Sequence, residues 1–310
     1  MVSFTLKHQW AMHFERKIVS EFNLSLDKIE NYSTRISPLI YCCLSHRRVK
    51  VKKWNIKTSN EFESSEWVNN KKWLKIKNKL ENGYDINHFM SKKLVDWMSV
   101  DYLLYTYNIY HFHLDKDNSG GIGEHLVFGV FYKDTFYVLG IENHNDLYSA
   151  RKWIQTIYNN WNNLDNLFQF KLKDSGITSF DPKELKKIAN NPNLQFNLVE
   201  PIDILNEDGQ SLSLIGHQHT NLTNVDLGYI KFEKIPIQAF IAFSNEENDI
   251  LNIESEILSK YRNNYHLNLT IDEKNFRYKI IINKNFFNTE IYNISKNKIT
   301  CSHYHKYTIK

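Results

Sequence analysis

Residues 107–144 have the sequence YNIYHFHLDKDNSGGIGEHLVFGVFYKDTFYVLGIENH. Its three runs of alternating aromatic, aliphatic and polar residues, YNIYHFHL, EHLVFGVFY and TFYVLGIENH, predict three strands. The Gly-rich loop Asp115–Gly123 separates the first two strands, and the short Lys133-Asp134 turn joins the last two as an antiparallel hairpin. The segment therefore predicts a small sheet with histidines near the ends of its strands.

Helices and further strands are expected on both sides of this sheet. Apolar residues at helical spacing predict helices over residues 8–22, 66–80, 90–105, 146–161 and 246–261. Alternation predicts strands over residues 48–57, 196–204, 211–215, 235–243, 266–271, 278–282 and 289–294. The expected fold class is α+β, with an antiparallel β-sheet core decorated by helices and a helix-rich, basic N-terminal region. Three parts are expected: a basic region over 1–98, a core over 99–175, and a partner-binding α+β region over 176–310.

The composition predicts a globular protein of the cytoplasm. The chain has 310 residues, 42% of them hydrophobic and 14% aromatic, which is too apolar for a disordered chain. Its three cysteines, Cys42, Cys43 and Cys301, form neither a disulfide framework nor a CxxC zinc pair. The first residues are charged and polar, so no signal peptide is expected, and no apolar run approaches the roughly 18 residues of a membrane span.

Positive charge is concentrated in the first third of the chain. Residues 1–100 hold 18 Lys/Arg and 10 Asp/Glu, a net of +8, whereas the whole chain has a net charge of +4. This asymmetry favours an anionic partner, although an ordinary solvated basic face would show the same pattern. Residues expected to contact nucleic acid are Arg47, Arg48, Lys50, Lys52, Lys53, Trp54 and Lys57, and the helix that carries Lys71, Lys72, Lys75, Lys77 and Lys79 could extend that surface.

Histidines occur in three His-x-His pairs, His111/His113, His217/His219 and His303/His305. Residues i and i+2 of a strand share a face, so each pair would place two imidazoles about 7 Å apart. Paired imidazoles serve either metal ligation or general acid/base chemistry. For the second and third pairs, ordinary hydrogen-bonded histidines are the favoured interpretation.

The central histidines are the better candidates because they lie beside a Gly-rich loop and a basic helix start. RNA cleavage through the 2′-hydroxyl requires a base, an acid and a cation for the developing phosphorane charge. The residues expected to supply these groups are His111, His113, His125, His144, Tyr110, Arg151 and Lys152. Neither a metal nor a cofactor is needed for this chemistry, and no HExxH, P-loop or dinucleotide motif is present.

Residues 103–148, LLYTYNIYHFHLDKDNSGGIGEHLVFGVFYKDTFYVLGIENHNDLY, resemble the β-hairpin core of RelE-type endoribonuclease toxins. The matching pieces are YNIYHFHL, HLVFGVFY and FYVLGIENH, of which the last ends at His144. The resemblance implies a RelE-like catalytic core over residues 99–175. The segment also resembles an uncharacterised bacterial family with an I-x-H-x-H-L strand. It departs from the toxins, which are small single domains and work mostly with Arg, Lys and Tyr, so only His144 is carried over.

The predicted function is a metal-independent endoribonuclease acting as a bacterial toxin or phage-defence (abortive infection) effector. His113 and His111 would act as base and acid, with His125 or His144 as the other proton carrier and Arg151 or Lys152 as the cation. One alternative is a metal-dependent hydrolase in which His111 and His113 bind the metal with His125, Glu142 or His144. Another is a non-enzymatic module that binds nucleic acid or senses a phage protein. RNA is the expected partner, an antitoxin or phage protein a further one, and the oligomeric state is left open.

Overall fold

The structure, a computed structural model, forms two compact units. Unit 1 comprises Met1–Cys42 and Ile241–Lys310, and unit 2 comprises Cys43–Phe240. The predicted boundary after residue 98 falls inside unit 2, and the one after residue 175 lies outside the described residues. The described residues are 6–29, 32–99, 101–114, 123–161, 168–172, 202–205, 208–216, 222–226, 231–260, 265–272, 277–284, 288–295 and 298–305.

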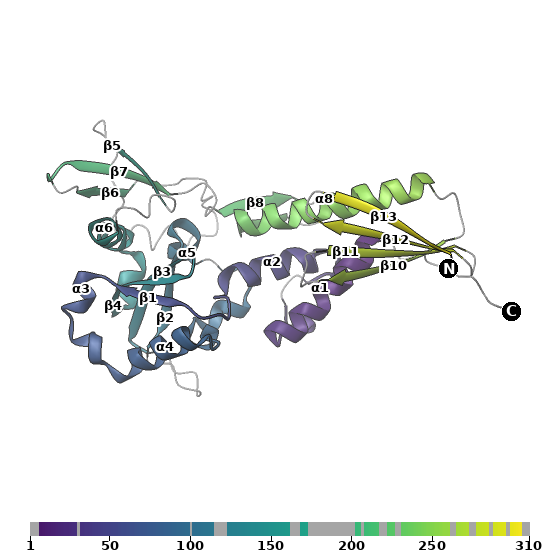
Figure 1. The fold of residues 1–310 in the computed structure, drawn as a ribbon. Helices are drawn as coiled ribbons and strands as arrows, with labels where there is room; N and C mark the ends of the chain where they lie inside the picture. The colour runs from purple at the N-terminus through teal and green to yellow at the C-terminus, as the bar shows by residue number, and fades with distance from the viewer. Residues whose placement is uncertain are drawn as a thin grey trace. The chain divides into compact units, whose positions relative to one another are not determined.

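The α+β fold class is confirmed (Figure 1). The main sheet of unit 2 has the order β1-β4-β3-β2, formed by β1 (Asn55–Thr58), β4 (Thr135–Asn143), β3 (His125–Tyr132) and β2 (Ile109–His113). The last three strands pair antiparallel as predicted, whereas β1 pairs parallel to β4. The main sheet is therefore mixed, because a strand from the N-terminal third joins its edge.

The strand predicted over residues 48–57 forms only at its end, as β1. The backbone of Val49 is bonded to a side chain instead of a strand, since Val49 N donates to Asn87 Oδ1 (2.8 Å) and Asn87 Nδ2 donates to Val49 O (3.0 Å). The chain then turns so that Trp54 N donates to Leu80 O (3.0 Å) and Asn55 N to Asp134 O (2.9 Å). A side-chain amide thus takes the backbone groups that a longer strand would use.

Helices cover both faces of the main sheet (Figure 1). Helix α6 (Ala150–Asn160) covers one face, where the ring of Trp153 stacks on that of Phe128 with centroids 4.3 Å apart. Helix α4 (Lys71–Asn82) covers the other face with Trp73, Ile76 and Leu80 buried. Alternate residues of each strand therefore enter two separate apolar cores.

The segment that precedes β2 differs from the single helix predicted over residues 90–105. It forms the 3-10 helix η5 (Lys92–Val95) and the short helix α5 (Tyr102–Tyr107). The Asp101 side chain accepts a hydrogen bond from Leu104 N (3.1 Å) and so caps the start of α5. Asn108, at φ 56°, ends α5 in the left-handed conformation that Asn tolerates, and β2 begins at the next residue.

Smaller elements complete unit 2. A three-stranded sheet has the order β5-β7-β6, and Gln155 of α6 fixes its edge by donating to Leu205 O and accepting from Leu205 N, both at 2.8 Å. The remaining bounds are α3 (Asn60–Glu63), η3 (Glu66–Asn69), η4 (Asn87–Phe89), η6 (His144–Tyr148), β5 (Phe168–Leu172), β6 (Ile202–Leu205), β7 (Ser211–Gly216), β8 (Leu222–Asp226) and β9 (Lys231–Pro236).

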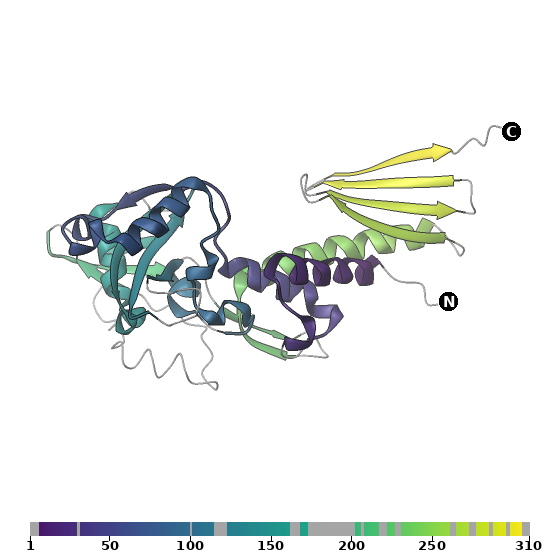
Figure 2. The same ribbon diagram turned by 90° about the horizontal axis from the view of Figure 1, so that it is seen from below.

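Unit 1 combines helices with a four-stranded antiparallel sheet (Figure 2). In it α1 and α8 are joined by a Lys7–Glu247 ion pair at 2.5 Å and by the stacked rings of Trp10 and Phe243, 6.0 Å apart. Its elements are α1 (Leu6–Phe22), η1 (Leu26–Lys28), η2 (Thr34–Ile36), β10 (Tyr265–Asp272), β11 (Arg277–Lys284), β12 (Asn288–Ser295) and β13 (Lys298–His305), with α2 (Ser37–Arg47) and α8 (Ile237–Lys260) crossing the boundary.

The strand predicted over residues 235–243 is wrong. Strand β9 ends at Pro236 and α8 begins at Ile237. Proline has no backbone N–H to donate to a continuing ladder, and it is favoured at helix starts. Among the described residues, no helix combines the length and apolar character that crossing a bilayer requires.

Candidate functional site

Three histidines of unit 2 lie in a row at one end of the main sheet. His111 and His113 share a face of β2, and their ring centroids are 6.0 Å apart. His144, the first residue of η6, places its ring centroid 5.2 Å from that of His113. His111 and His113 are buried, and His144 is half-buried. The structure thus brings together three of the four histidines predicted from the sequence; His111, His113 and His144 are called the histidine row below.

The pairing of the strands explains why these histidines meet. Leu126 of β3 is paired on one side with His113 of β2 and on the other with Glu142 of β4. The carboxyl ends of β2 and β4 therefore lie at the same level of the sheet, and the chain enters η6 just beyond β4. Asn143 caps η6 by accepting a hydrogen bond from Asn145 N (2.8 Å), which holds His144 at the sheet end.

An acidic residue that the sequence reasoning missed lies against the first histidine of the row. Oδ2 of Asp101 is 3.5 Å from Nδ1 of His111, and Oδ1 accepts the capping hydrogen bond from Leu104 N. Burial, together with the Asp101 charge, also raises the pKa of Tyr148. The sequence signal was an Asp directly before the helix YLLYTY, which indicates a cap; nothing in it placed that cap beside His111.

His125 and Tyr110 lie on the opposite face of the main sheet, which corrects the predicted set. His113 pairs with Leu126, so the side chain of His125, one residue earlier in β3, points to the other face. There its ring contacts that of Trp67, with centroids 4.7 Å apart. The side chains of Ile109 and His111 point to the side of the sheet that carries the histidine row, so Tyr110, which lies between them, points to the other side. There its ring packs edge-on against that of Phe131, with centroids 5.1 Å apart. Burial, with a smaller effect of the Asp101 charge, raises the pKa of Tyr110, so its hydroxyl stays protonated at neutral pH.

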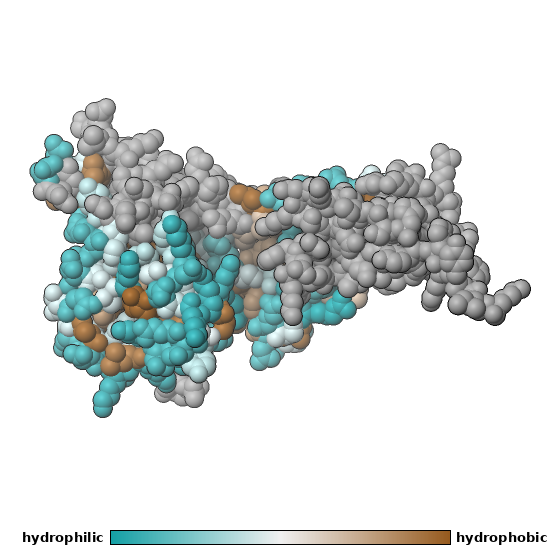
Figure 3. Space-filling view, viewed as in Figure 1, coloured by the Kyte–Doolittle hydropathy of each residue, from teal (hydrophilic) through white to brown (hydrophobic). Residues whose placement is uncertain are grey.

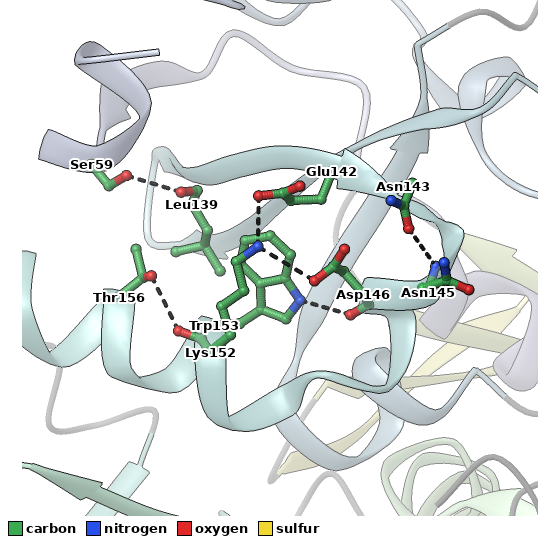
Figure 4. A network of polar contacts seen from close by, with 9 residues as sticks. All are labelled: Ser59, Leu139, Glu142, Asn143, Asn145, Asp146, Lys152, Trp153 and Thr156. Carbon is green, nitrogen blue, oxygen red and sulfur yellow. Dashed lines mark hydrogen bonds and ion pairs between the residues drawn. The ribbon is translucent and has the colours of Figure 1, made fainter. Parts of the chain in front are cut away.

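The predicted cations lie in the first turn of α6, on the same side of the sheet as the histidine row. Lys152 Nζ is 2.6 Å from Glu142 Oε1 and 3.3 Å from Asp146 Oδ1 (Figure 4). Its ammonium group is therefore shared by two carboxylates, whereas Arg151 is exposed. Trp153 Nε1 donates to Asp146 O (3.0 Å), so this network also anchors η6, and His144 with it, to α6.

Two of the predicted nucleic-acid contacts are internal to the fold. Arg47 is buried, and its guanidinium donates to Lys93 O (3.0 Å), to Asp96 O and to the Tyr105 hydroxyl. Trp54 is also buried, and its Nε1 donates to Lys50 O (3.1 Å). These two side chains stabilise unit 2, and because they are buried they cannot contact RNA at its surface.

The other predicted contacts have different environments. Lys52 Nζ lies 2.5 Å from Asp134 Oδ1 and 4.1 Å from the centroid of the Trp54 ring, so its charge is engaged within the protein. Arg48 is half-buried. Only Lys50, Lys53 and Lys57 of the predicted set are exposed.

The metal-binding alternative requires a cluster of ligand side chains, and the described residues contain none. None of the described His, Cys, Asp and Glu side chains form a group of three or more that could hold a metal ion. Of the other histidine pairs, His217 and His219 lie outside the described residues, and His303 and His305 belong to β13 of unit 1, of which only the backbone is described.

Comparison of the chain with protein-family models, with curated proteins and with solved structures found no match. The resemblance of residues 103–148 to RelE-type toxins therefore stays a prediction.

Proposed function

We propose that the protein is a metal-independent endoribonuclease whose reaction takes place at the histidine row. The observation that carries the proposal is the close approach of three imidazoles, from β2 and η6, at one end of the main sheet. Imidazole can accept or donate a proton near neutral pH, so one ring can act as a base while a neighbouring ring acts as an acid.

In the proposed reaction His113 removes the proton of the ribose 2′-hydroxyl, whose oxygen then attacks the adjacent phosphorus. The P–O5′ bond breaks, His144 donates its proton to the departing 5′-oxygen, and a 2′,3′-cyclic phosphate remains on the other fragment. Arg151 is the candidate cation for the phosphorane, because Lys152 is already shared by Glu142 and Asp146. The roles are thus distributed among side chains on one side of the sheet.

The proposed setting is that of a cytoplasmic toxin or phage-defence effector. It is supported by the resemblance of residues 103–148 to RelE-type toxins, which act on RNA. In this setting an antitoxin or a phage protein would control the activity of the chain.

The proposal is tested with purified protein, EDTA and two oligonucleotides of one sequence, one of RNA and one of DNA. We expect cleavage of the RNA alone, with a 2′,3′-cyclic phosphate on the product, because the mechanism uses the 2′-hydroxyl and no metal. Equal cleavage of the DNA, or cleavage that requires a divalent metal, would show a different mechanism. Absence of RNA cleavage, with no growth arrest or RNA fragmentation on induced expression, would refute the proposal.

Asp101→Asn is expected to slow this cleavage by on the order of tenfold while leaving the stability of the protein almost unchanged. Asn caps a helix as well as Asp does, so the hydrogen bond to Leu104 N can be kept. The variant removes the carboxylate that lies 3.5 Å from His111 Nδ1, and His111 is the direct neighbour of the proposed base His113, so the histidine row loses a charge that orients it. Single-turnover cleavage rates and thermal unfolding check both points; an unchanged rate in a stable variant would remove Asp101 from the site.

A further inference from the structure

One flank of α4 carries a line of lysines. Lys72, Lys75 and Lys79 are spaced i, i+3 and i+7, so they lie along the same side of the helix. Lys72 and Lys75 are exposed and Lys79 is half-buried, while the adjacent side of the helix, about 100° further round its axis, is buried in the core. The flank is therefore an ordered strip of positive charge.

An exposed aromatic ring lies at the end of this strip. Tyr84 has 60% of its surface exposed, and Lys79 Nζ lies 6.0 Å from the centroid of its ring. Lys75 Nζ lies 5.9 Å from the centroid of the Phe89 ring, so two of the three lysines stand near aromatic side chains. The nearby Asp85 already accepts two hydrogen bonds from Asn87, both at 2.8 Å.

The segment that precedes β1 continues this surface. A Cβ atom built on Gly83 would lie 3.0 Å from Lys53 N, so the turn after α4 packs directly against the backbone of that segment. Lys50 and Lys53 of the segment are exposed. Figure 3 shows mainly hydrophilic side chains (teal), with a few hydrophobic ones (brown), on the face of unit 2 that includes α4. The α4 surface is defined here as Lys50, Lys53, Lys72, Lys75, Lys79 and Tyr84.

We propose that the α4 surface binds single-stranded RNA, with phosphates on the lysines and one base stacked on Tyr84. Sequence-independent binding of a single strand uses two elements. Positively charged side chains follow the phosphate backbone of the nucleic acid, and an exposed aromatic ring stacks on any base. The helix is held at both ends, by Asn70, which accepts from Lys72 N at 2.9 Å, and by Gly83 at φ 76°, so little order has to be gained on binding.

This proposal rests on the proposed function in naming RNA, but the two can fail separately. Helix α4 covers the face of the main sheet opposite to the one that carries His111 and His113. Changes in the α4 surface should therefore alter binding without touching the groups that move protons. Binding can also be measured when cleavage is blocked.

The experiment is fluorescence anisotropy with a labelled single-stranded RNA of about 20 nucleotides, long enough for a typical binding site, in the His113→Ala background. Tyr84→Ala should weaken binding about tenfold, and Tyr84→Phe should restore it, because stacking needs only the ring. Lys75→Gln with Lys79→Gln should weaken binding and lower the slope of log Kd against log salt by about 1.4. The matched control, Lys28→Gln with Lys133→Gln, removes the same charge from exposed positions outside the α4 surface.

Three results would overturn the proposal. The first is equal loss of affinity in the two lysine pairs, which would show a response to net charge alone. The second is unchanged binding in Tyr84→Ala, and the third is equal loss for duplex RNA in Tyr84→Ala, since paired bases cannot stack on the ring. Circular dichroism of each variant verifies that α4 is intact.

Discussion

His113→Ala is expected to lower the rate of RNA cleavage by about two to four orders of magnitude, the usual contribution of a positioned acid or base. His113 stands in the middle of the histidine row, 6.0 Å from His111 and 5.2 Å from His144 between ring centroids. Its loss breaks both neighbouring pairs at once. The measurement is a single-turnover cleavage assay on one RNA, with total RNA from induced cells as a second readout.

His125→Ala is the matched control for this prediction. It removes an imidazole from the same sheet end, but from the opposite face, where the ring contacts Trp67. We expect it to retain cleavage within about twofold, since its ring takes no part in acid/base transfer. A comparable loss in both variants would mean that histidines support the fold here, and full activity of a well-folded His113→Ala protein would end the acid/base proposal at this site.

Gly129→Ala is expected to lower the free energy of unfolding of unit 2 by about 3 kcal/mol, the upper part of the range for overpacking. Gly129 lies at an irregularity of the β3–β4 pairing, and a Cβ atom there would be 2.4 Å from Phe136 Cζ and 2.7 Å from Tyr137 O. Phe136 is fully buried and its ring stacks on Phe131 at 4.4 Å, so it has little room to move. Urea unfolding followed by tryptophan fluorescence measures the change.

Gly209→Ala separates crowding from backbone strain. Gly209 has φ 74° and no heavy atom within 4 Å of its built Cβ, so alanine there meets strain without a clash. We expect it to cost about 1 kcal/mol. If Gly129→Ala proved no more destabilising than Gly209→Ala, the close approach of Phe136 and Tyr137 to Gly129 would not be a real constraint on the sheet.

Several features were determined by local sequence. The β3–β4 hairpin follows from two alternating runs with Lys133-Asp134 between them, and Lys133 takes the left-handed φ of 53° that the turn needs. The placement of His111 and His113 on one face of the sheet follows from the two-residue repeat of a β-strand. Each of these patterns involves residues close in sequence, so no knowledge of packing was required.

The tertiary structure decided which of the candidate side chains meet. His125 was separated from the other histidines by the register of β2 on β3, which pairs His113 with Leu126. Arg47 and Trp54 look like surface residues in a basic stretch, yet both are buried. The parallel pairing of β1 with β4 and the approach of Asp101 to His111 also join separate segments.

The physical reason for this division is the range of the interactions. Backbone conformation and the alternation of faces depend on neighbouring residues, so the sequence by itself determined the central strands and the sharing of one face by His111 and His113. Burial and register depend on which distant apolar surfaces pack together and which backbone groups remain to be bonded. Only the tertiary structure therefore placed His144 beside His113, set Asp101 against His111, and left Tyr84 as the exposed ring at the end of α4.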